Sequence, residues 1–196
     1  MEMIRAVSPW ALLASWILFS GMLAWNHGRV RVQRRRLGIP EEKPAIRDVR
    51  SMHGLVLEGL SFLIAFAFWQ GPHASADWRH AMSIGAGLLS VVVLGGALRH
   101  LGLQWRIKAV VTDDHQLVTG GPYALVRHPV FLSLFCLLIA TVSLGTSTWA
   151  AVAAVGVCIY GTEIRIRAED GLLTRRFGQT YLDYQRRVAA ILPGIR

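Results

Sequence analysis

The sequence is poor in acidic residues, in cysteine and in the motifs of soluble cofactor domains. Its 196 residues contain 12 Asp and Glu against 21 Lys and Arg, a formal net charge of +9. The two cysteines, Cys136 and Cys158, lie in apolar segments and behave as small hydrophobic residues, so neither a disulfide framework nor a zinc site is expected. No internal repeat occurs, and no G-x-G-x-x-G motif follows a strand-like segment, which argues against a soluble Rossmann-type domain.

Apolar residues, by contrast, are abundant and gathered in blocks. They make up 53% of the chain, and the mean hydropathy is +0.41. The blocks cover roughly residues 9–25, 55–70, 81–98, 129–145 and 149–163. Because a bilayer core takes about 20 helical residues, the first three blocks are long enough to span it, and the last two are short but serviceable. The sequence therefore predicts an all-α integral membrane protein with five transmembrane helices in one membrane domain, residues 1–196.

Basic residues are distributed unevenly around these blocks. Of the 21 Lys and Arg, 19 lie between the first and second block, between the third and fourth, or after the fifth. The positive-inside rule places these segments in the cytoplasm and leaves only Arg5 and Arg79 outside, which predicts an N-outside, C-inside topology. The positive charge then indicates contact with anionic lipid headgroups and no nucleic-acid partner. A bacterial inner membrane with the active site facing the cytoplasm is the expected location.

Two segments outside the blocks are predicted from their breakers and periodicity. Residues 27–52 are expected to be a cytoplasmic loop, because "GIPEEKP" discourages helix. From Glu163 onward, apolar and aromatic residues recur every three or four positions, which predicts an amphipathic cytoplasmic helix at the membrane surface, bent or interrupted at Gly178.

Glu58 lies inside the second block, where an ionisable side chain is costly. It is expected to reach headgroups, to pair with a neighbouring helix or to have a functional role.

The stretch "GGPYALVRHPVF" marks the start of the fourth block. Two glycines and a proline predict a turn, and Pro129 suits the first turn of a helix. Taken alone, Arg127 reads as a headgroup anchor and His128 as an interfacial histidine. Glu169 lies at the same membrane depth, and its spacing from Arg165 predicts an i, i+4 ion pair on one helix face.

Three segments together are informative: "LGLQW", "HQLVTGGPYALVRHP" and "EIRIRAEDGLLTRRFGQTYLDYQRRVAAILPGI". In order and spacing they resemble the isoprenylcysteine carboxyl methyltransferase family and the related membrane phospholipid methyltransferases. The resemblance covers about residues 98–195, which divides the domain into an N-terminal three-helix part (1–97) and a cofactor-binding catalytic part (98–196). It implies the methyl donor S-adenosylmethionine, the product S-adenosylhomocysteine, and a lipophilic acceptor from the bilayer, nominally the carboxylate of a prenylated cysteine.

The resemblance also implies roles for particular residues. The implied cofactor-binding residues are His115, Leu117, Val118, Tyr123, His128, Pro129, Phe131 and Glu169. The implied catalytic residues are Arg165, Glu169 and His128, with Arg165 also facing the acceptor, and no metal is implied. The chain departs from the family at Asp170, where a second Glu is usual, at Phe131, where Tyr is frequent, and at Ser133, where Gly is frequent. Without the hydroxyl, Phe131 offers only its ring.

The residues by themselves leave other functions open. A carboxylate acceptor needs no general base, whereas a phospholipid amine or a small hydrophobic thiol would need deprotonation by His128, Glu169 or Asp170. A sterol-reductase-like enzyme using NADPH and a non-catalytic membrane scaffold are the alternatives from other classes. Binding of S-adenosylmethionine, of NADPH or of neither distinguishes the methyltransferase, the reductase and the scaffold.

Overall fold

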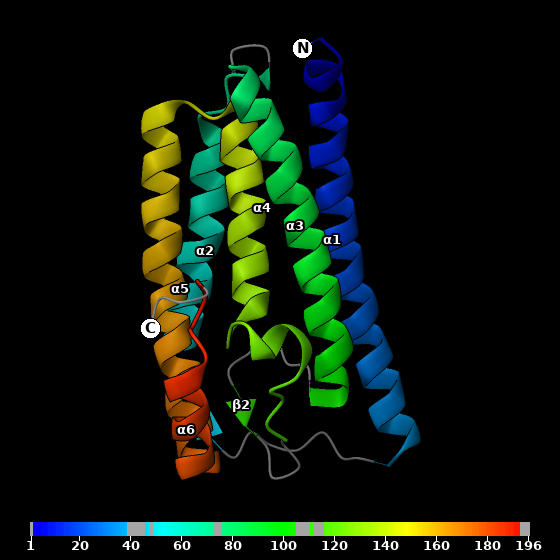
Figure 1. Cartoon of the computed structure of the whole chain (residues 1–196), viewed down its shortest axis with the longest axis vertical. Helices are drawn as coiled ribbons and strands as arrows, with labels where there is room; N and C mark the ends of the chain where they lie inside the picture. The colour runs from blue at the N-terminus through cyan, green and yellow to red at the C-terminus, as the bar shows by residue number, and fades with distance from the viewer. Residues whose placement is uncertain are drawn as a thin grey trace.

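The chain folds into long helices that run in alternating directions along one axis (Figure 1). The computed structural model describes residues 2–38, 46–47, 49–72, 76–104, 110–111 and 116–192. The helices are α1 (Glu2–Arg36), α2 (Arg50–Ala67), α3 (Asp77–Leu101), α4 (Pro129–Gly145), α5 (Thr148–Phe177) and α6 (Gln179–Arg187). The other described elements are the 3-10 turns η2 (Gly102–Gln104) and η3 (Gly121–Ala124), and the antiparallel strands β1 (Ile46–Arg47) and β2 (Val110–Val111).

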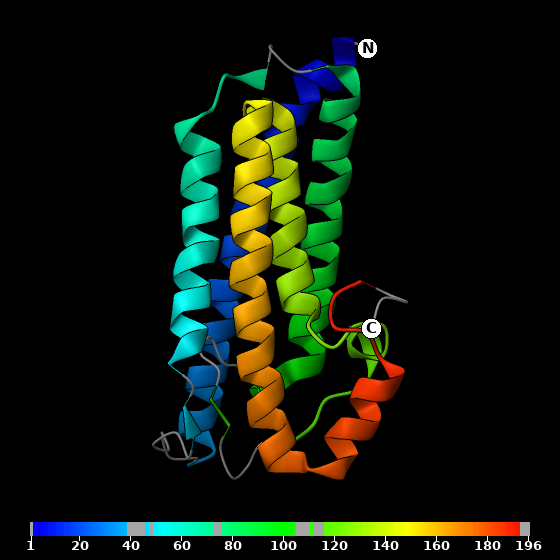
Figure 2. The same cartoon turned by 90° about the vertical axis from the view of Figure 1, so that its left-hand side faces the viewer.

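Helix α4 lies at the centre of the bundle. α2 packs along α5, and α3 packs between α1 and α4, as Figures 1 and 2 show. The adjacent residues Leu137 and Leu138 of α4 are both fully buried, but they belong to different clusters. Leu137 packs with Phe19 and Leu94 of α1 and α3, whereas Leu138 packs with Cys158 of α5. Neighbouring positions on a helix face different directions, so α4 joins the two halves of the bundle.

The outside of the bundle is also apolar. Trp10, Ile17, Leu88 and Val152 are all at least 60% exposed. A helix that is apolar on both its packed and its exposed face is typical of a membrane span. Helices α1, α3 and α5 are long and apolar enough to cross a membrane, and α4 is a shorter apolar helix. The predicted helical membrane fold is thus supported, and the five crossings and their orientation stay predictions.

The boundaries of α4 agree with the sequence, but those of α1 and α5 differ. α4 covers the predicted block 129–145. Residues 27–52 were predicted to be a loop, yet α1 continues to Arg36, because no Gly or Pro interrupts residues 29–36 and arginine favours the C-terminal turns of a helix. Glu163 was predicted to begin a separate helix, but it lies within α5, which continues to Phe177.

Gly178 turns the chain back on itself. Its φ is 53°, a left-handed value that favours glycine and ends a helix. α6 then runs back beside the lower end of α5 (Figure 2). The predicted interruption at Gly178 is confirmed. The buried Tyr181 and Tyr184 of α6 face the protein, so the apolar side of α6 is covered by the chain itself and not by lipid.

Arg79 closes the opposite end of the bundle. Its Nε donates to the carbonyl of Ser143 at 2.8 Å, and its Nη2 donates to those of Val142 and Thr146 at 2.9 and 2.6 Å. These carbonyls belong to the C-terminal turn of α4 and its cap, which lack partners within the helix. Arg5 forms an ion pair with Asp77 at the same end. The two basic residues that the topology rule leaves outside therefore have structural partners.

Candidate active site

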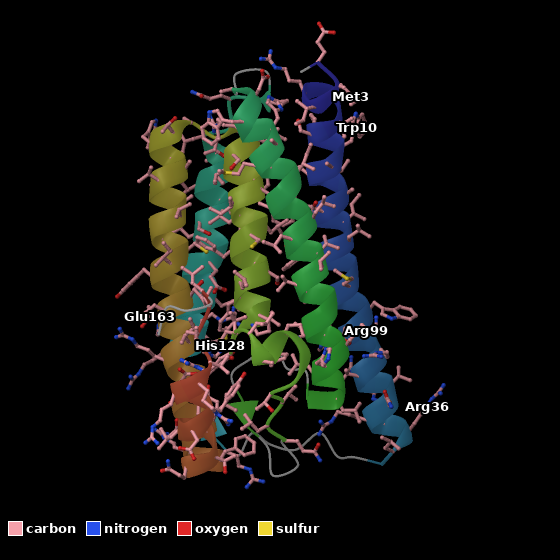
Figure 3. All side chains as sticks on the ribbon, viewed as in Figure 1. Met3, Trp10, Arg36, Arg99, His128 and Glu163 are labelled. Atoms are coloured by element: carbon pink, nitrogen blue, oxygen red, sulfur yellow. The ribbon has the colours of Figure 1, made fainter. Side chains whose placement is uncertain are left out.

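The chain enters α4 through a turn of two glycines and a proline. Gly121 has φ 60°, and a Cβ on it would lie 2.2 Å from Nε2 of His100, so only glycine fits there. The turn continues as η3, in which Tyr123 is buried, and Pro129 occupies the first turn of α4. The predicted turn and helix start are confirmed. His128 lies at this junction, where α4 begins beside α5 (Figure 3).

The side chain of Arg127 holds the segment that follows α6. Its Nη1 donates to the carbonyl of Val188 at 2.6 Å, and its Nη2 donates to Oδ2 of Asp170 at 3.1 Å. Its backbone N–H donates to the carbonyl of Ala189 at 2.8 Å. The side chain is only 11% exposed. Arg127 therefore links α5 to the chain after α6, and its interpretation as a headgroup anchor is wrong.

The imidazole of His128 lies between two acids of α5. Its Nε2 lies 2.9 Å from Oδ1 of Asp170, and its Nδ1 lies 3.4 Å from Oε2 of Glu169. Tyr181 of α6 also donates its hydroxyl to Oδ1 of Asp170. Residues from the start of α4, from α5 and from α6 thus meet at one carboxylate. Glu169 keeps 27% of its side chain exposed, whereas His128 keeps 4%.

The electrostatics of this cluster favour protonated His128. Burial disfavours the charged imidazolium, but its hydrogen bonds to Asp170 and Glu169 outweigh burial and raise the pKa of His128 to about 9. For Tyr184, by contrast, burial itself raises the pKa, to about 12, so its hydroxyl stays a donor and bonds the carbonyl of Tyr123 at 2.5 Å. At neutral pH both ring nitrogens of His128 then donate, and neither can accept a proton.

Phe131 connects this cluster to Arg165. Its ring stacks on that of His128, with centroids 5.3 Å apart and an interplanar angle of 8°. The Cζ atom of Arg165 lies 4.4 Å from the Phe131 ring centroid, within the range of a cation–π contact. Phe131 thus contacts both residues through its ring, and the hydroxyl of a tyrosine is not required for either contact.

Arg165 does not form the ion pair expected from its spacing. Its Nη1 lies 2.5 Å from Oε2 of Glu58 on α2, while Glu169 contacts His128 instead. Thr162 donates its hydroxyl to Oε1 of Glu58 at 3.0 Å. Glu58 is 1% exposed, so it neither reaches headgroups nor stands alone; it pairs with a neighbouring helix, one of the roles considered for it.

The structure brings together most of the predicted site residues. Tyr123, His128, Pro129 and Phe131 are buried at the start of α4. Leu117 and Val118 are half-buried in the segment that leads into the turn, and His115 lies outside the described residues.

Sequence reasoning treated Asp170 as a departure from the family and as a candidate base, and it missed Tyr181 and Tyr184, whose hydroxyls bond Asp170 and the carbonyl of Tyr123. The available signal was the spacing of the two tyrosines, which lie three residues apart on an arginine-rich helix and so share one face. Tyrosines on a buried face usually hydrogen-bond through their hydroxyls.

Comparison with known proteins bears on this arrangement. Residues 83–175 match the model of the isoprenylcysteine carboxyl methyltransferase (ICMT) family. The resemblance inferred from the sequence is confirmed. The ICMT segment extends from α3 through most of α5, so it contains the turn, the RHP triplet, Arg165 and the Glu169–Asp170 pair. Tyr181, Tyr184 and Glu58 lie outside it.

Individual relatives are similar over different lengths. Protein-S-isoprenylcysteine O-methyltransferase of Rattus norvegicus is 34% identical over 70% of this chain and 49% of its own. Nickel-cobalt-cadmium resistance protein NccN of Alcaligenes xylosoxydans xylosoxydans is 35% identical over 56% of this chain and 52% of its own. The chain thus spans about half the length of these two relatives. Probable protein-S-isoprenylcysteine O-methyltransferase of Oryza sativa subsp. japonica is 26% identical over 98% of this chain and all of its own.

A solved structure shares the fold. The eukaryotic intramembrane Ras methyltransferase ICMT superposes with a TM-score of 0.50 over 77% of this chain and 55% of that chain, at 23% identity. At that identity the likeness shows the fold alone. Within the part of the chain that the structure describes, no group of three His, Cys, Asp or Glu side chains is arranged to hold a metal ion.

Proposed function

We propose that the protein is an integral membrane methyltransferase that transfers a methyl group from S-adenosylmethionine to a lipophilic acceptor. The observation that carries the proposal is the contact of His128 with Glu169 and Asp170. This contact unites the RHP and Glu-Asp motifs on which the family resemblance depends. A family match over the same residues and a shared fold with a membrane methyltransferase support it.

The residues around this contact suit the proposed cofactor. S-adenosylmethionine supplies an electrophilic methyl group on a cationic sulfonium when it is bound. A cation of this kind is stabilised by carboxylates and aromatic faces, which Glu169 and Tyr123 offer. Arg127 contributes a buried Nε donor with no hydrogen-bond partner among the described atoms, which suits an acceptor group such as a carboxylate. Leu117, Val118 and Phe131 would supply apolar surface.

The main task of the side chains in the site is to align the two reactants and to exclude water from them. His128 donates from both ring nitrogens, so we assign it the orientation of Glu169 and not the removal of a proton. A carboxylate acceptor is already ionised at neutral pH and needs no base. Arg165 would face that acceptor, because a guanidinium recognises a carboxylate through paired hydrogen bonds. Alignment and exclusion of water then supply most of the rate enhancement.

The acceptor would reach the site from the bilayer, and the site would face the cytoplasm. His128 lies toward the same end of the bundle as Arg36 and Arg99, and away from Met3 (Figure 3). The basic residues of the last turns of α1, α3, α5 and α6 also gather toward that end. Under the positive-inside rule it is the cytoplasmic end, in a bacterial inner membrane. A prenylated cysteine carboxylate is the nominal acceptor.

The first test is calorimetric titration of the detergent-purified protein with S-adenosylhomocysteine, with NADPH titrated in parallel. We expect binding of S-adenosylhomocysteine alone. Transfer of labelled methyl groups to farnesylated N-acetylcysteine, a phospholipid amine and a long-chain thiol then identifies the acceptor class. Binding of NADPH alone would replace the proposal with a reductase, and binding of neither would leave a membrane scaffold.

A further inference from the structure

A buried ion pair joins α2 to the proposed site from outside the family segment. Glu58 is 1% exposed and Arg165 is 8% exposed, and their charged atoms lie 2.5 Å apart. Removing two charges from water is costly, and the cost is offset only when each charge finds good partners. Thr162 adds a hydrogen bond to the second oxygen of Glu58. The carboxylate of Glu58 is therefore held in place from both sides.

Glycines let α2 approach the arginine this closely. A Cβ on Gly54 would lie 2.5 Å from Cγ of Arg165 and 2.5 Å from the carbonyl oxygen of Gly161. A Cβ on Gly161 would lie 2.9 Å from the carbonyl oxygen of Gly54. The stem of Arg165 consequently lies against the bare backbone of α2, one turn before Glu58. Gly54 and Glu58 together form what we call the α2 seat.

The α2 seat determines where the guanidinium of Arg165 lies relative to the rest of the site. One side of the guanidinium meets Glu58, and Cζ lies 4.4 Å from the Phe131 ring centroid. Phe131 in turn stacks on His128, which contacts Glu169. A shift of the arginine stem would therefore change the distance between the acceptor side and the cofactor side of the site.

We propose that the α2 seat, Gly54 and Glu58, positions Arg165 for binding of the acceptor carboxylate. This inference rests on the proposed function, in which Arg165 faces the acceptor. Gly54 and Glu58 are positioning residues, since they act through Arg165. The seat gives α2 a share in acceptor recognition, although α2 lies outside the ICMT segment.

Two variants test the seat by different physical routes. Glu58→Gln keeps the shape of the side chain but removes the charge that holds the guanidinium, and Gly54→Ala displaces the arginine stem. In both, we expect the KM for farnesylated N-acetylcysteine to rise about 10-fold or more, with kcat changed less than about 3-fold. The Kd for S-adenosylhomocysteine should stay within about 2-fold, because the contacts of Glu169 and His128 are untouched.

Matched controls separate positioning from general damage. Glu163→Gln alters an exposed Glu–Arg pair on α5, and Gly59→Ala adds a methyl group on α2 where nothing lies within 4 Å. Neither control should change KM. A KM that stays at the wild-type value in Glu58→Gln and Gly54→Ala would overturn the proposal, as would an equal rise in the controls.

A chemical readout keeps the seat testable without any activity. Phenylglyoxal modifies accessible guanidinium groups, and peptide mass spectrometry reports each arginine separately. Arg165 should react slowly in the wild type and about 10-fold faster in Glu58→Gln, while the exposed Arg167 reacts quickly in both. Unchanged reactivity of Arg165 in Glu58→Gln would overturn the proposal that Glu58 holds its guanidinium. Failure of the wild type to bind S-adenosylhomocysteine would instead refute the proposed function and leave this result standing.

Discussion

Nε2 of His128 lies 2.9 Å from Oδ1 of Asp170, and this contact joins the start of α4 to the C-terminal part of α5 across 42 residues of sequence. The same carboxylate receives Arg127 and Tyr181. Because three donors converge on Asp170, it is the centre of the cluster, and Glu169 is the more exposed acid, at 27% of its side chain against 16%. The two neighbouring acids thus differ in their surroundings: Asp170 holds the cluster together, and Glu169 is the acid that the proposed function assigns to the cofactor.

This division predicts the behaviour of Glu169→Gln. We expect the affinity for S-adenosylhomocysteine to fall about 10-fold or more, since a tenfold change needs only about 1.4 kcal/mol of lost interaction. The thermal unfolding temperature should hardly change, because Glu169 is partly exposed. Calorimetric titration and thermal unfolding in detergent measure both. Glu163→Gln is the control on the same helix, and equal losses in the two variants would refute the assignment of Glu169.

The raised pKa of His128 predicts a pH-dependent stability. A group whose pKa is higher in the folded protein stabilises it fully below the unfolded value of 6.5, and this contribution is lost as the pH rises through about 9. Thermal unfolding followed between about pH 6 and 10 should show the loss. His128→Asn should abolish that dependence. A wild-type curve that is flat across this range would contradict the charged state assigned to His128.

Arg79 should stabilise the far end of the bundle without affecting the site. Arg79→Ala leaves three carbonyls at the end of α4 without their donor, and we expect a loss of about 1–3 kcal/mol in the free energy of unfolding. Thermal unfolding measures the loss. The affinity for S-adenosylhomocysteine should remain unchanged, and a weakened affinity would show that the two ends are coupled. The exposed Arg167→Ala serves as the control.

Two adjacent glycines at the turn before α4 should differ in their tolerance of alanine. Gly121→Ala places a Cβ in the left-handed region and against His100, and we expect about 1–3 kcal/mol of destabilisation. At Gly120, φ is −94° and nothing lies within 4 Å of an added Cβ, so Gly120→Ala should be nearly neutral. Thermal unfolding compares them. Similar destabilisation of the two variants would contradict the backbone conformation of this turn.

The sequence by itself determined the elements whose causes are local. Pro129 and the apolar residues after it define α4, and Gly178 ends α5, because proline, glycine and apolar patterning act within a few residues. It also indicated the similarity to the ICMT family, since the RHP and Glu-Asp motifs keep their order and spacing. The end of α5 was predicted too early, at Glu163, because the change there from apolar to charged residues does not interrupt the helix, and no proline lies between Glu163 and Phe177.

Only the tertiary structure decided which charged residues meet. The spacing of Arg165 and Glu169 predicted a pair on one helix face, but the partner of Arg165 is Glu58, 107 residues away. Side-chain pairing depends on how helices are rotated and how closely they approach, and here Gly54 and Gly161 bring α2 against α5. These contacts arise from packing between helices, which the periodicity of one helix does not specify.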